Sequence, residues 1–192
     1  MKFYQVFSAI YETGAKEMCR ECEGFIKKGS RILDLGCGSG IVGHIFKNHF
    51  SVQVLGADIK DLRVKKIPFV LYDGKRLPFL DNEFDVVFIG YVLHHCGNPK
   101  KTIAEAKRVS KNRIIVFEDD QDGFFSRLMG FFHQITYNLF FLQKKQFLNF
   151  KTQKEWIDFF KKARLKIVFQ KNIFHKFRWI FPQKRLFYVL DK

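Results

Sequence analysis

The sequence predicts an α/β fold in which helices cover both faces of a mostly parallel sheet, and three observations support this. Five short apolar segments recur between residues 31 and 118. Segments with helical periodicity, such as 99–110, alternate with them. The segment FDVVFIG, residues 84–90, is continuously apolar after Asp85, which is typical of a strand covered on both faces. Alternating strands and helices indicate a parallel sheet, because parallel neighbours need a crossover connection.

An N-terminal helix is predicted over residues 3–28, within a helical segment that we place at 1–29. Gly29 and Ser30 are expected to end it. Its apolar residues recur at intervals of three and four, the spacing of one helix face, and they are Phe3, Val6, Phe7, Ile10 and Tyr11.

The central part of the chain is predicted to contain five strands, each ending close to a glycine or an acidic residue. A helix is expected to follow the first strand as far as Phe50, and a second to span 99–110 with Pro99 in its first turn. The strands are expected at residues 31–35, 52–57, 67–72, 84–90 and 112–118.

The C-terminal part is predicted to add helices and the last two strands. Residues 152–163 form an amphipathic helix in which Thr152 and Glu155 make a capping box. The last strands are expected at 164–170 and 184–190. Before them, 123–142 is predicted to be one apolar helix or a helical pair, because helical spacing is kept by Phe124, Leu128, Phe132, Ile135, Leu139 and Leu142.

Length and composition fit a single domain spanning 1–192. No run of 18 apolar residues is free of charges, so we expect no transmembrane span, and the N-terminus lacks the features of a signal peptide. The cysteines suggest no disulfide framework, and no second ligand pair accompanies the C-x-x-C of Cys19 and Cys22. We therefore expect a cytoplasmic protein with reduced thiols and no metal site.

Charge and aromatic residues are distributed unevenly. Residues 1–120 carry 19 Lys and Arg against 15 Asp and Glu, whereas 121–192 carry 15 against 4 and hold 15 of the 25 phenylalanines. This basic, aromatic part favours an acidic partner such as RNA or an anionic membrane surface, at which the protein would be peripheral. The alternative is a solvated lysine surface over a phenylalanine-rich core.

The stretch ILDLGCGSGIVG, residues 32–43, places alternating glycines behind an apolar strand. Such turns hold phosphates, dinucleotides or phosphate-free nucleosides. A phosphate-binding loop needs Gly-Lys-Ser/Thr, which is missing, and the dinucleotide fingerprint needs glycine where Ile41 stands. Asp58 lies 22 residues after Gly36, where an acid can bind ribose hydroxyls. The acids expected at the strand ends do not attract phosphates, and they are Asp34, Asp58, Asp73, Glu118, Asp119 and Asp120.

ILDLGCGSG resembles the first motif of class I S-adenosylmethionine (SAM)-dependent methyltransferases. The resemblance continues through GADI, 56–59, and YDGKRLPFLDNEFDVVFIGYVLHH, 72–95, and more loosely over 150–190. The small-molecule "type 11" branch is the most similar. This resemblance implies a Rossmann-like, seven-stranded sheet whose last strand is antiparallel, with SAM bound across its carboxyl edge.

Carried over by position, the resemblance implies a role for each residue of the cofactor site. These are Gly36, Gly38 and Gly40 under the methionine and ribose; Asp34 at the methionine ammonium; Asp58 at the ribose hydroxyls; Ile59 against the adenine; Asp73 and Gly74 at the adenine amino group and a ring nitrogen; and Gly90 and Tyr91 beside the transferable methyl. Two departures stand out. The turn SKNRI replaces the usual Pro-Gly-Gly before the fifth strand, and the helix after the second strand is trimmed to about 61–66.

Methyl transfer requires a base only when the acceptor must lose a proton. The candidates for catalytic residues are Tyr91, His94 and His95, which follow the fourth strand, while His133 is a weaker one. A structural role for these histidines is the alternative.

The acceptor itself is left open by the sequence. The apolar insert 121–150 stands where the family builds its substrate cover, and it favours a small apolar or lipid-like molecule. An RNA methyltransferase is the alternative, because KNIFHKFRWIFPQKR, 171–185, interleaves basic and aromatic residues. A further alternative is a binding module that keeps the fold without transferring a methyl group.

Overall fold

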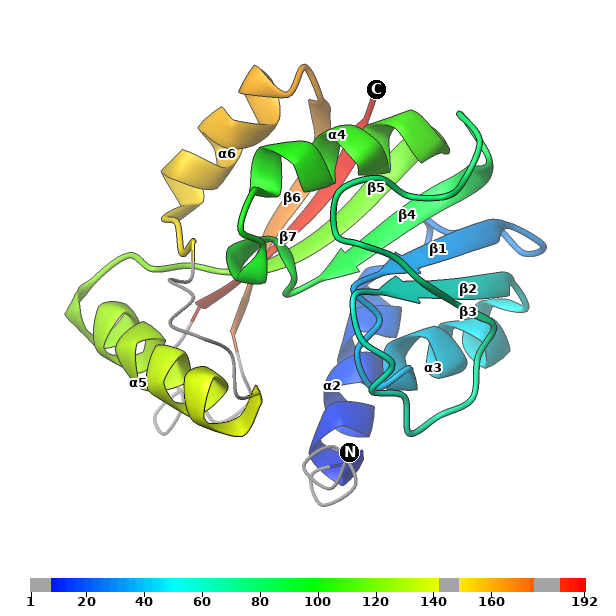
Figure 1. Cartoon of the computed structure of the whole chain (residues 1–192). Coiled ribbons are helices and arrows are strands. Elements are labelled where there is room, and N and C mark those ends of the chain that lie inside the picture. The colour runs from blue at the N-terminus through cyan, green and yellow to red at the C-terminus, as the bar shows by residue number, and fades with distance from the viewer. Residues whose placement is uncertain (1–7, 142–148, 175–183) are drawn as a thin grey trace. The chain divides into compact units, whose positions relative to one another are not determined.

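The structure is a computed structural model that describes residues 8–141, 149–174 and 184–192 (Figure 1). Parts of three predicted segments therefore lie outside the described residues. These are the start of the N-terminal helix with Phe3, Val6 and Phe7, the end of the apolar insert, and the middle of the basic aromatic segment 171–185.

Seven strands hydrogen-bond in the order β3-β2-β1-β4-β5-β7-β6. Pairing is parallel between β1 and β2, β1 and β4, and β2 and β3, whereas β6 and β7 are antiparallel. This confirms the predicted mostly parallel, seven-stranded α/β sheet. The strands are β1 (Arg31–Leu35), β2 (Gln53–Asp58), β3 (Phe69–Leu71), β4 (Phe84–Gly90), β5 (Ser110–Asp119), β6 (Lys166–Phe174) and β7 (Lys184–Asp191).

Five α-helices and one 3₁₀ helix connect the strands in the described residues. In its described part the insert contains one helix, and the segment 61–66 between β2 and β3 contains none. The helices are α2 (Ser8–Glu21), α3 (Ile41–Phe50), the 3₁₀ helix η1 (Leu93–His95), α4 (Pro99–Val109), α5 (Phe124–Phe141) and α6 (Gln153–Lys162).

The contacts divide the chain into two compact units. Unit 1 comprises residues up to 90 together with 105–114, and unit 2 comprises 91–104 and 115–192. The single-domain organisation stays a prediction, and each unit is described separately below.

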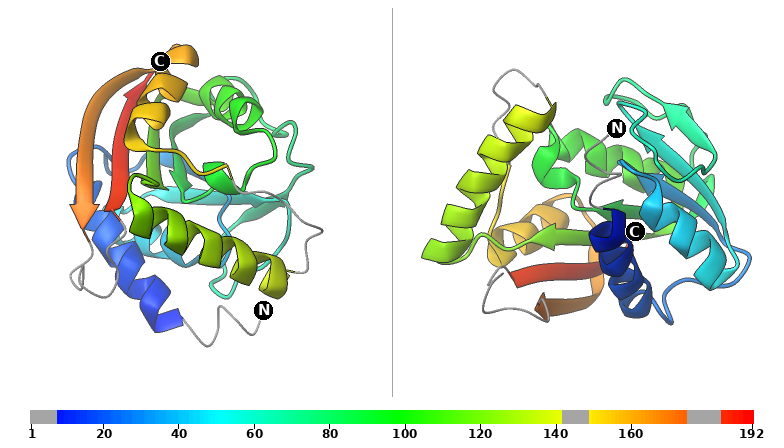
Figure 2. Two further views of the ribbon diagram at one scale, coloured as in Figure 1. Left: turned by 90° about the vertical axis from the view of Figure 1, so that its left-hand side faces the viewer. Right: turned by 90° about the horizontal axis from the view of Figure 1, so that it is seen from below.

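In unit 1, β1 lies between β2 and β4, so the order of strands reverses beside it. This is the position at which open parallel sheets bind ligands. Helices α2 and α3 lie side by side (Figure 2). The ring of Phe46 in α3 packs edge-on at 4.7 Å from Phe88 in β4, which fixes α3 on the sheet.

In unit 2, aromatic side chains of β7 alternate between two layers of the core. Phe187 stacks on Phe117 of β5 at 4.6 Å, and Tyr188 meets Phe160 of α6 at 5.1 Å. The predicted capping box starts α6, because Thr152 and Glu155 exchange both hydrogen bonds.

The N-terminal helix differs from the prediction in its end and in its buried face. It ends at Glu21, where a turn through Gly24 at φ 82° replaces the expected continuation to residue 28. Ile10 is 68% exposed, and the buried residues are Ala15 and Cys19. Small residues face inward where α2 packs on α3. Tyr11 is 38% exposed, and the other residues of the predicted apolar face, Phe3, Val6 and Phe7, lie outside the described residues.

Candidate functional site

The glycine loop between β1 and α3 takes a conformation that side chains strongly disfavour. Gly36, Gly38 and Gly40 all have positive φ, at 77°, 47° and 71°. The Gly36 N–H donates to the carbonyl of Ala57 in β2 at 2.7 Å, which holds the loop against the neighbouring strand. The predicted glycine turn is therefore present in unit 1, and it lies where the order of strands reverses.

Asp58 lies at the end of β2 and binds this loop directly. Its Oδ2 accepts the Gly38 N–H at 2.9 Å, and its Oδ1 accepts the Ile59 N–H at 2.7 Å and the Lys60 N–H at 3.4 Å. All three donors are backbone groups. Burial raises the pKa of Asp58 above its ordinary value, and these N–H groups oppose the rise. Carboxylate oxygens have about four acceptor sites together, so capacity remains for a ligand hydroxyl.

Asp34 lies deeper, within β1, and is 3% exposed. Burial raises the pKa of Asp34 to about 7, the neighbouring Asp58 charge adds to the rise, and the Gly43 N–H opposes it. Its Oδ2 has no hydrogen-bond partner among the described residues. An unsatisfied buried carboxylate oxygen is costly, so a donor or cation at this position would stabilise it.

The segment between β2 and β3 packs directly against Gly40. A Cβ at Gly40 would lie 2.6 Å from the carbonyl oxygen of Lys65 and 3.3 Å from Cγ of Arg63. The Val64 and Lys65 N–H groups also donate to the carbonyl of Ser39, at 2.8 and 3.1 Å. The segment 61–66, in which the resemblance showed a trimmed helix, therefore lies on the glycine loop. No local sequence pattern predicts this contact.

Ile59, Asp73 and Gly74 come together beyond the end of β2. A Cβ on Gly74 would lie 3.2 Å from Cγ2 of Ile59, and Ile59 itself is 50% exposed. Asp73 accepts the N–H groups of Lys75 at 2.8 Å and Arg76 at 3.2 Å. These hydrogen bonds hold the pKa of the Asp73 carboxyl below its ordinary value, so it stays ionised. The structure thus places the exposed apolar side chain of Ile59 near a hydrogen-bond acceptor, the Asp73 carboxylate.

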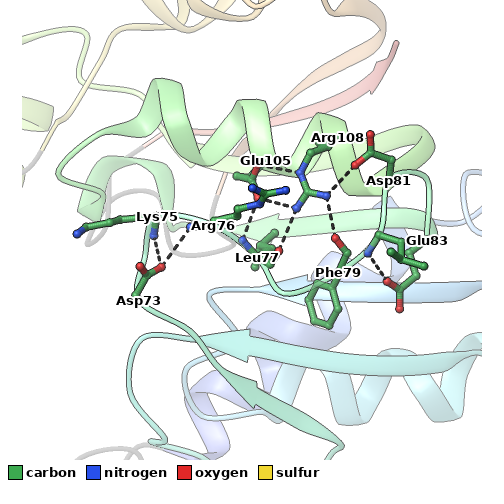
Figure 3. A network of polar contacts seen from close by, with 10 residues as sticks. Asp73, Lys75, Arg76, Leu77, Phe79, Asp81, Glu83, Glu105 and Arg108 are labelled. Atoms are coloured by element: carbon green, nitrogen blue, oxygen red, sulfur yellow. Dashed lines mark hydrogen bonds and ion pairs between the residues drawn. The ribbon is translucent and has the colours of Figure 1, made fainter.

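The segment that carries Asp73 is anchored by Arg108 of α4 (Figure 3). The Arg108 guanidinium donates to the carbonyls of Leu77 at 3.0 Å and Phe79 at 2.8 Å. It also pairs with Glu105 and Asp81, each at 2.8 Å. Glu105 in turn accepts the Leu77 N–H at 2.9 Å. The Arg108 guanidinium therefore holds several residues of the loop between β3 and β4 together, a role that the sequence motif does not indicate.

Gly90 ends β4, and its chain neighbour Tyr91 begins unit 2. A Cβ on Gly90 would lie 2.9 Å from the Phe88 ring, so glycine is required by packing. Tyr91 has φ 58°, which is uncommon for a residue with a side chain. Its N–H donates to Phe117 O at 2.8 Å, and the Arg185 guanidinium lies 5.6 Å from its ring. Such strain at a strand end is often found at functional sites.

His94 is not open to solvent but forms part of a buried pair in unit 2. It is 1% exposed, and its Nδ1 lies 2.6 Å from Oε2 of Glu118, whose Oε1 accepts the Leu93 N–H at 2.7 Å. Burial lowers the pKa of His94, but the Glu118 charge and hydrogen bond and the Asp119 charge outweigh it and raise the pKa above its ordinary value. Sequence reasoning placed His94 and Glu118 at strand ends and missed that they pair.

A strap formed by Asn149 and Phe150 covers the 3₁₀ helix. The Asn149 N–H donates to the His94 carbonyl at 2.7 Å, and its side-chain amide donates to the Cys96 carbonyl at 2.6 Å. The Phe150 ring stacks on the His94 ring at 4.9 Å, and the His95 ring lies 4.1 Å from the His94 ring. The two candidate histidines are thus packed together, and His133 lies apart from them in the sequence, in α5.

Unit 2 contains a groove of about 470 Å³ between α5 and the start of α6. Its volume is in the range of small-molecule sites. Phe150, which stacks on His94, is one of its walls. The lining is a mixture of aromatic, amide and charged residues, namely Gln121, Arg127, Gly130, Phe131, Phe150, Thr152 and Glu155.

Known proteins resemble the chain in both sequence and fold. Residues 33–117 match a family model described as a methyltransferase domain. An uncharacterized protein of Methanocaldococcus jannaschii is 33% identical over 66% of this chain and 60% of its own length. A demethylmenaquinone methyltransferase of Renibacterium salmoninarum is 35% identical over 47% of this chain and 41% of its own length.

A solved structure resembles nearly the whole chain. It is phosphoethanolamine N-methyltransferase 2 of Haemonchus contortus, in complex with phosphomonomethylethanolamine and S-adenosylhomocysteine. The TM-score is 0.70 at 14% identity, over 94% of this chain and 52% of the other. At this identity the likeness concerns the fold alone. The chain spans 60% and 41% of the two curated relatives described above.

Proposed function

We propose that the chain is a class I methyltransferase that transfers the methyl group of S-adenosyl-L-methionine to a small apolar acceptor, because residues 33–117 match a methyltransferase-domain model and a relative is named as a methyltransferase. The observation that carries the proposal is the pair of acids beside the glycine loop. Among the described residues, Asp34 has an oxygen without a hydrogen-bond partner, and Asp58 accepts hydrogen bonds from three backbone N–H groups. Such carboxylates suit a ligand with an ammonium, a sulfonium and two hydroxyls but no phosphate.

In this proposal each predicted residue acts on one part of the cofactor. Asp58 accepts hydrogen bonds from the ribose hydroxyls while it keeps the Gly38 N–H in place. Ile59 packs on the adenine, with Asp73 and Gly74 at its polar edge. The negative charge of the Asp34 carboxylate stabilises the ammonium group of the methionine part.

Gly36, Gly38 and Gly40 allow the loop backbone to approach the cofactor. The bound cofactor supplies an electrophilic methyl group on a sulfonium. The chain contributes mainly position and exclusion of water, because the reaction is an in-line displacement in which charge is dispersed. Gly90, the last residue of β4, and Tyr91, which follows it, would line the reacting end of the cofactor.

A base is optional in this mechanism. His94 is held by Glu118 and covered by Phe150, so we propose that it positions its neighbours and does not take a proton from the acceptor. Tyr91 and His95 remain the candidates for direct contact with the reacting groups. An acceptor whose nucleophile carries no removable proton would need neither.

We propose that the acceptor binds in the groove of unit 2, under the insert predicted to cover the substrate. Phe131 and Phe150 give it an apolar wall, and Arg127 and Glu155 provide polar contacts. One curated relative is named as a demethylmenaquinone methyltransferase, and a quinone named in this way favours an acceptor of similar character.

The test is a methyl-labelling experiment. The protein is incubated with methyl-labelled SAM and a cell extract, which is then separated into lipid, RNA, protein and small-molecule fractions. We expect label in the lipid or small-molecule fraction, and none with Asp58→Asn. Label in RNA would favour the RNA methyltransferase instead. SAM binding without any labelled product would favour the non-catalytic binding module.

A further inference from the structure

Helix α5 turns large apolar side chains towards solvent. Their exposed fractions run from 39% to 76%. The spacing of four, three, one and three residues places them along one face of the helix. Members of this apolar ridge are Phe124, Leu128, Phe131, Phe132 and Ile135. A surface helix ordinarily shows the opposite arrangement, with apolar residues inward and polar residues outward.

Two small residues of α5 face inward. Ser126 and Gly130 are buried, and a Cβ on Gly130 would lie 2.6 Å from Oε1 of Gln121. This close approach leaves no space for a side chain at position 130. The packing of α5 in unit 2 therefore accounts for its small residues but gives no reason for the apolar ridge. An exposed apolar ridge of this kind marks a surface that contacts another apolar phase.

The charges of the helix and its surroundings point to an anionic partner. Helix α5 contains no acidic residue, and Arg127 is its one formal charge. In the sequence Lys144 and Lys145 follow shortly after it, and residues 121–192 carry 15 Lys and Arg against 4 Asp and Glu. A helix with an apolar face in a basic setting suits the interface of an anionic bilayer.

We propose that the apolar ridge of α5 docks in the headgroup region of an anionic lipid bilayer. RNA fits this face less well, because phosphate contacts need cations and the ridge presents only carbon side chains. A bilayer offers an apolar phase for the phenylalanines and anionic headgroups for the lysines. Among the described residues no helix is long and apolar enough to cross a membrane, so the helix lies along the interface.

The ridge and the groove share Phe131, which is 60% exposed and lines the groove. An apolar acceptor dissolved in the bilayer could thus pass from the membrane into the groove along the same side of α5. This second step rests on the proposed function, whereas the docking of α5 does not depend on it.

Vesicle co-sedimentation tests the docking. The full chain is mixed with vesicles of phosphatidylcholine alone, or of phosphatidylcholine with phosphatidylglycerol, across a salt series. We expect binding to the anionic vesicles that weakens as salt rises. The double variant Leu128→Asn and Ile135→Asn should bind them at least about tenfold less, because it lacks two apolar side chains that docking would bury in the bilayer.

The matched control is the double variant Ile10→Asn and Leu80→Asn, which removes two apolar side chains of unit 1 that are 68% and 78% exposed. It should bind the vesicles as the wild type does. Thermal melting and SAM calorimetry on all variants separate loss of docking from loss of fold or of cofactor binding. A wild type that ignores anionic vesicles would overturn the proposal, as would equal losses in both double variants.

Two further outcomes would also overturn it. If the α5 variant instead lost binding to a single-stranded RNA of mixed sequence, the ridge would serve RNA. If light scattering showed a wild-type oligomer that the α5 variant converts to a monomer, the ridge would be covered by a second copy of the chain.

Discussion

The Nδ1 atom of His94 lies 2.6 Å from Oε2 of Glu118, and both side chains are almost completely buried. Glu118 also fixes the 3₁₀ helix through the Leu93 N–H, and Phe150 of the groove wall stacks on the His94 ring. The pair thus links the end of β5 and the 3₁₀ helix to the groove. Its removal should affect the stability of unit 2.

Glu118→Gln should destabilise the protein by about 3 kcal/mol, since breaking one side of a buried pair leaves the other uncompensated. The raised pKa of His94 makes the pair's contribution complete below about pH 6.5 and lost as the pH rises through the folded-state pKa. Denaturant unfolding at several pH values measures this. The variant should lack that part of the pH dependence.

Glu23→Gln is the matched control for this prediction. It breaks the exposed pair of His49 and Glu23, at 3.2 Å, and should change the unfolding free energy by no more than about 1 kcal/mol. Equal effects of Glu23→Gln and Glu118→Gln would contradict the assignment of His94 as a buried positioning residue.

Asp34 predicts that SAM binding depends on pH. Its pKa of about 7 exceeds the unfolded value of about 3.9, so the free protein loses stability as the pH rises between these values. A cationic ligand favours the ionised form. Affinity for SAM should therefore increase with pH below about 7, by at most about tenfold per pH unit, with release of a proton.

Calorimetry in buffers of different ionisation enthalpy measures that proton. Asp34→Asn should weaken binding and abolish the pH dependence of the affinity. A wild-type affinity that stays flat between pH 5.5 and 7.5, values on either side of the expected transition at about 7, would remove Asp34 from the site.

Gly40→Ala should destabilise unit 1 by about 1–3 kcal/mol. The new Cβ would lie 2.6 Å from the Lys65 carbonyl at a φ of 71°, and the backbone would have to move. Gly14→Ala in α2 is the control, because nothing lies within 4 Å of its Cβ and alanine favours a helix. The midpoint temperature of thermal unfolding should fall for Gly40→Ala and should stay unchanged or rise for Gly14→Ala.

Arg108→Met should loosen the segment that carries Asp73. The guanidinium holds the carbonyls of Leu77 and Phe79, so its loss should cost about 1–3 kcal/mol and weaken SAM binding several-fold. Lys101→Met, an exposed change in the same helix, should alter neither. Unchanged SAM affinity in Arg108→Met would show that this loop does not contribute to the cofactor site.

Much of the fold could be predicted because its signals are local. The bounds of β1 and β4 agree with the prediction, since each is a short apolar run between polar residues or glycines. The capping box of α6 is likewise a pattern within four residues. The buried face of α2 could not be predicted, because close packing against α3 selects Ala15 and Cys19 over the larger Ile10.

The candidate site divides in the same way. The positive φ angles of Gly36 and Gly38, and the position of Asp58 at the end of β2, agree with a motif that spans few residues. The contact of Lys65 with Gly40 and the pairing of His94 with Glu118 join segments 24 or more residues apart. No local pattern encodes such contacts, since they follow from how neighbouring strands align.

The contact of Lys65 could not be predicted for a second reason. The segment 61–66 has no helical or strand periodicity from which its path could be read, yet the N–H groups of Val64 and Lys65 donate to the Ser39 carbonyl of the glycine loop.

The most direct test of the account is calorimetric titration with SAM. The wild type should bind one SAM per chain. Asp58→Asn should bind at least about tenfold more weakly, because charge-assisted hydrogen bonds of about 1.5–3 kcal/mol are lost. Asp85→Asn changes a partly exposed acid at the start of β4, and this variant should bind SAM as the wild type does. A wild type that does not bind SAM, or an Asp58→Asn variant with wild-type affinity, would contradict the cofactor site proposed for this chain.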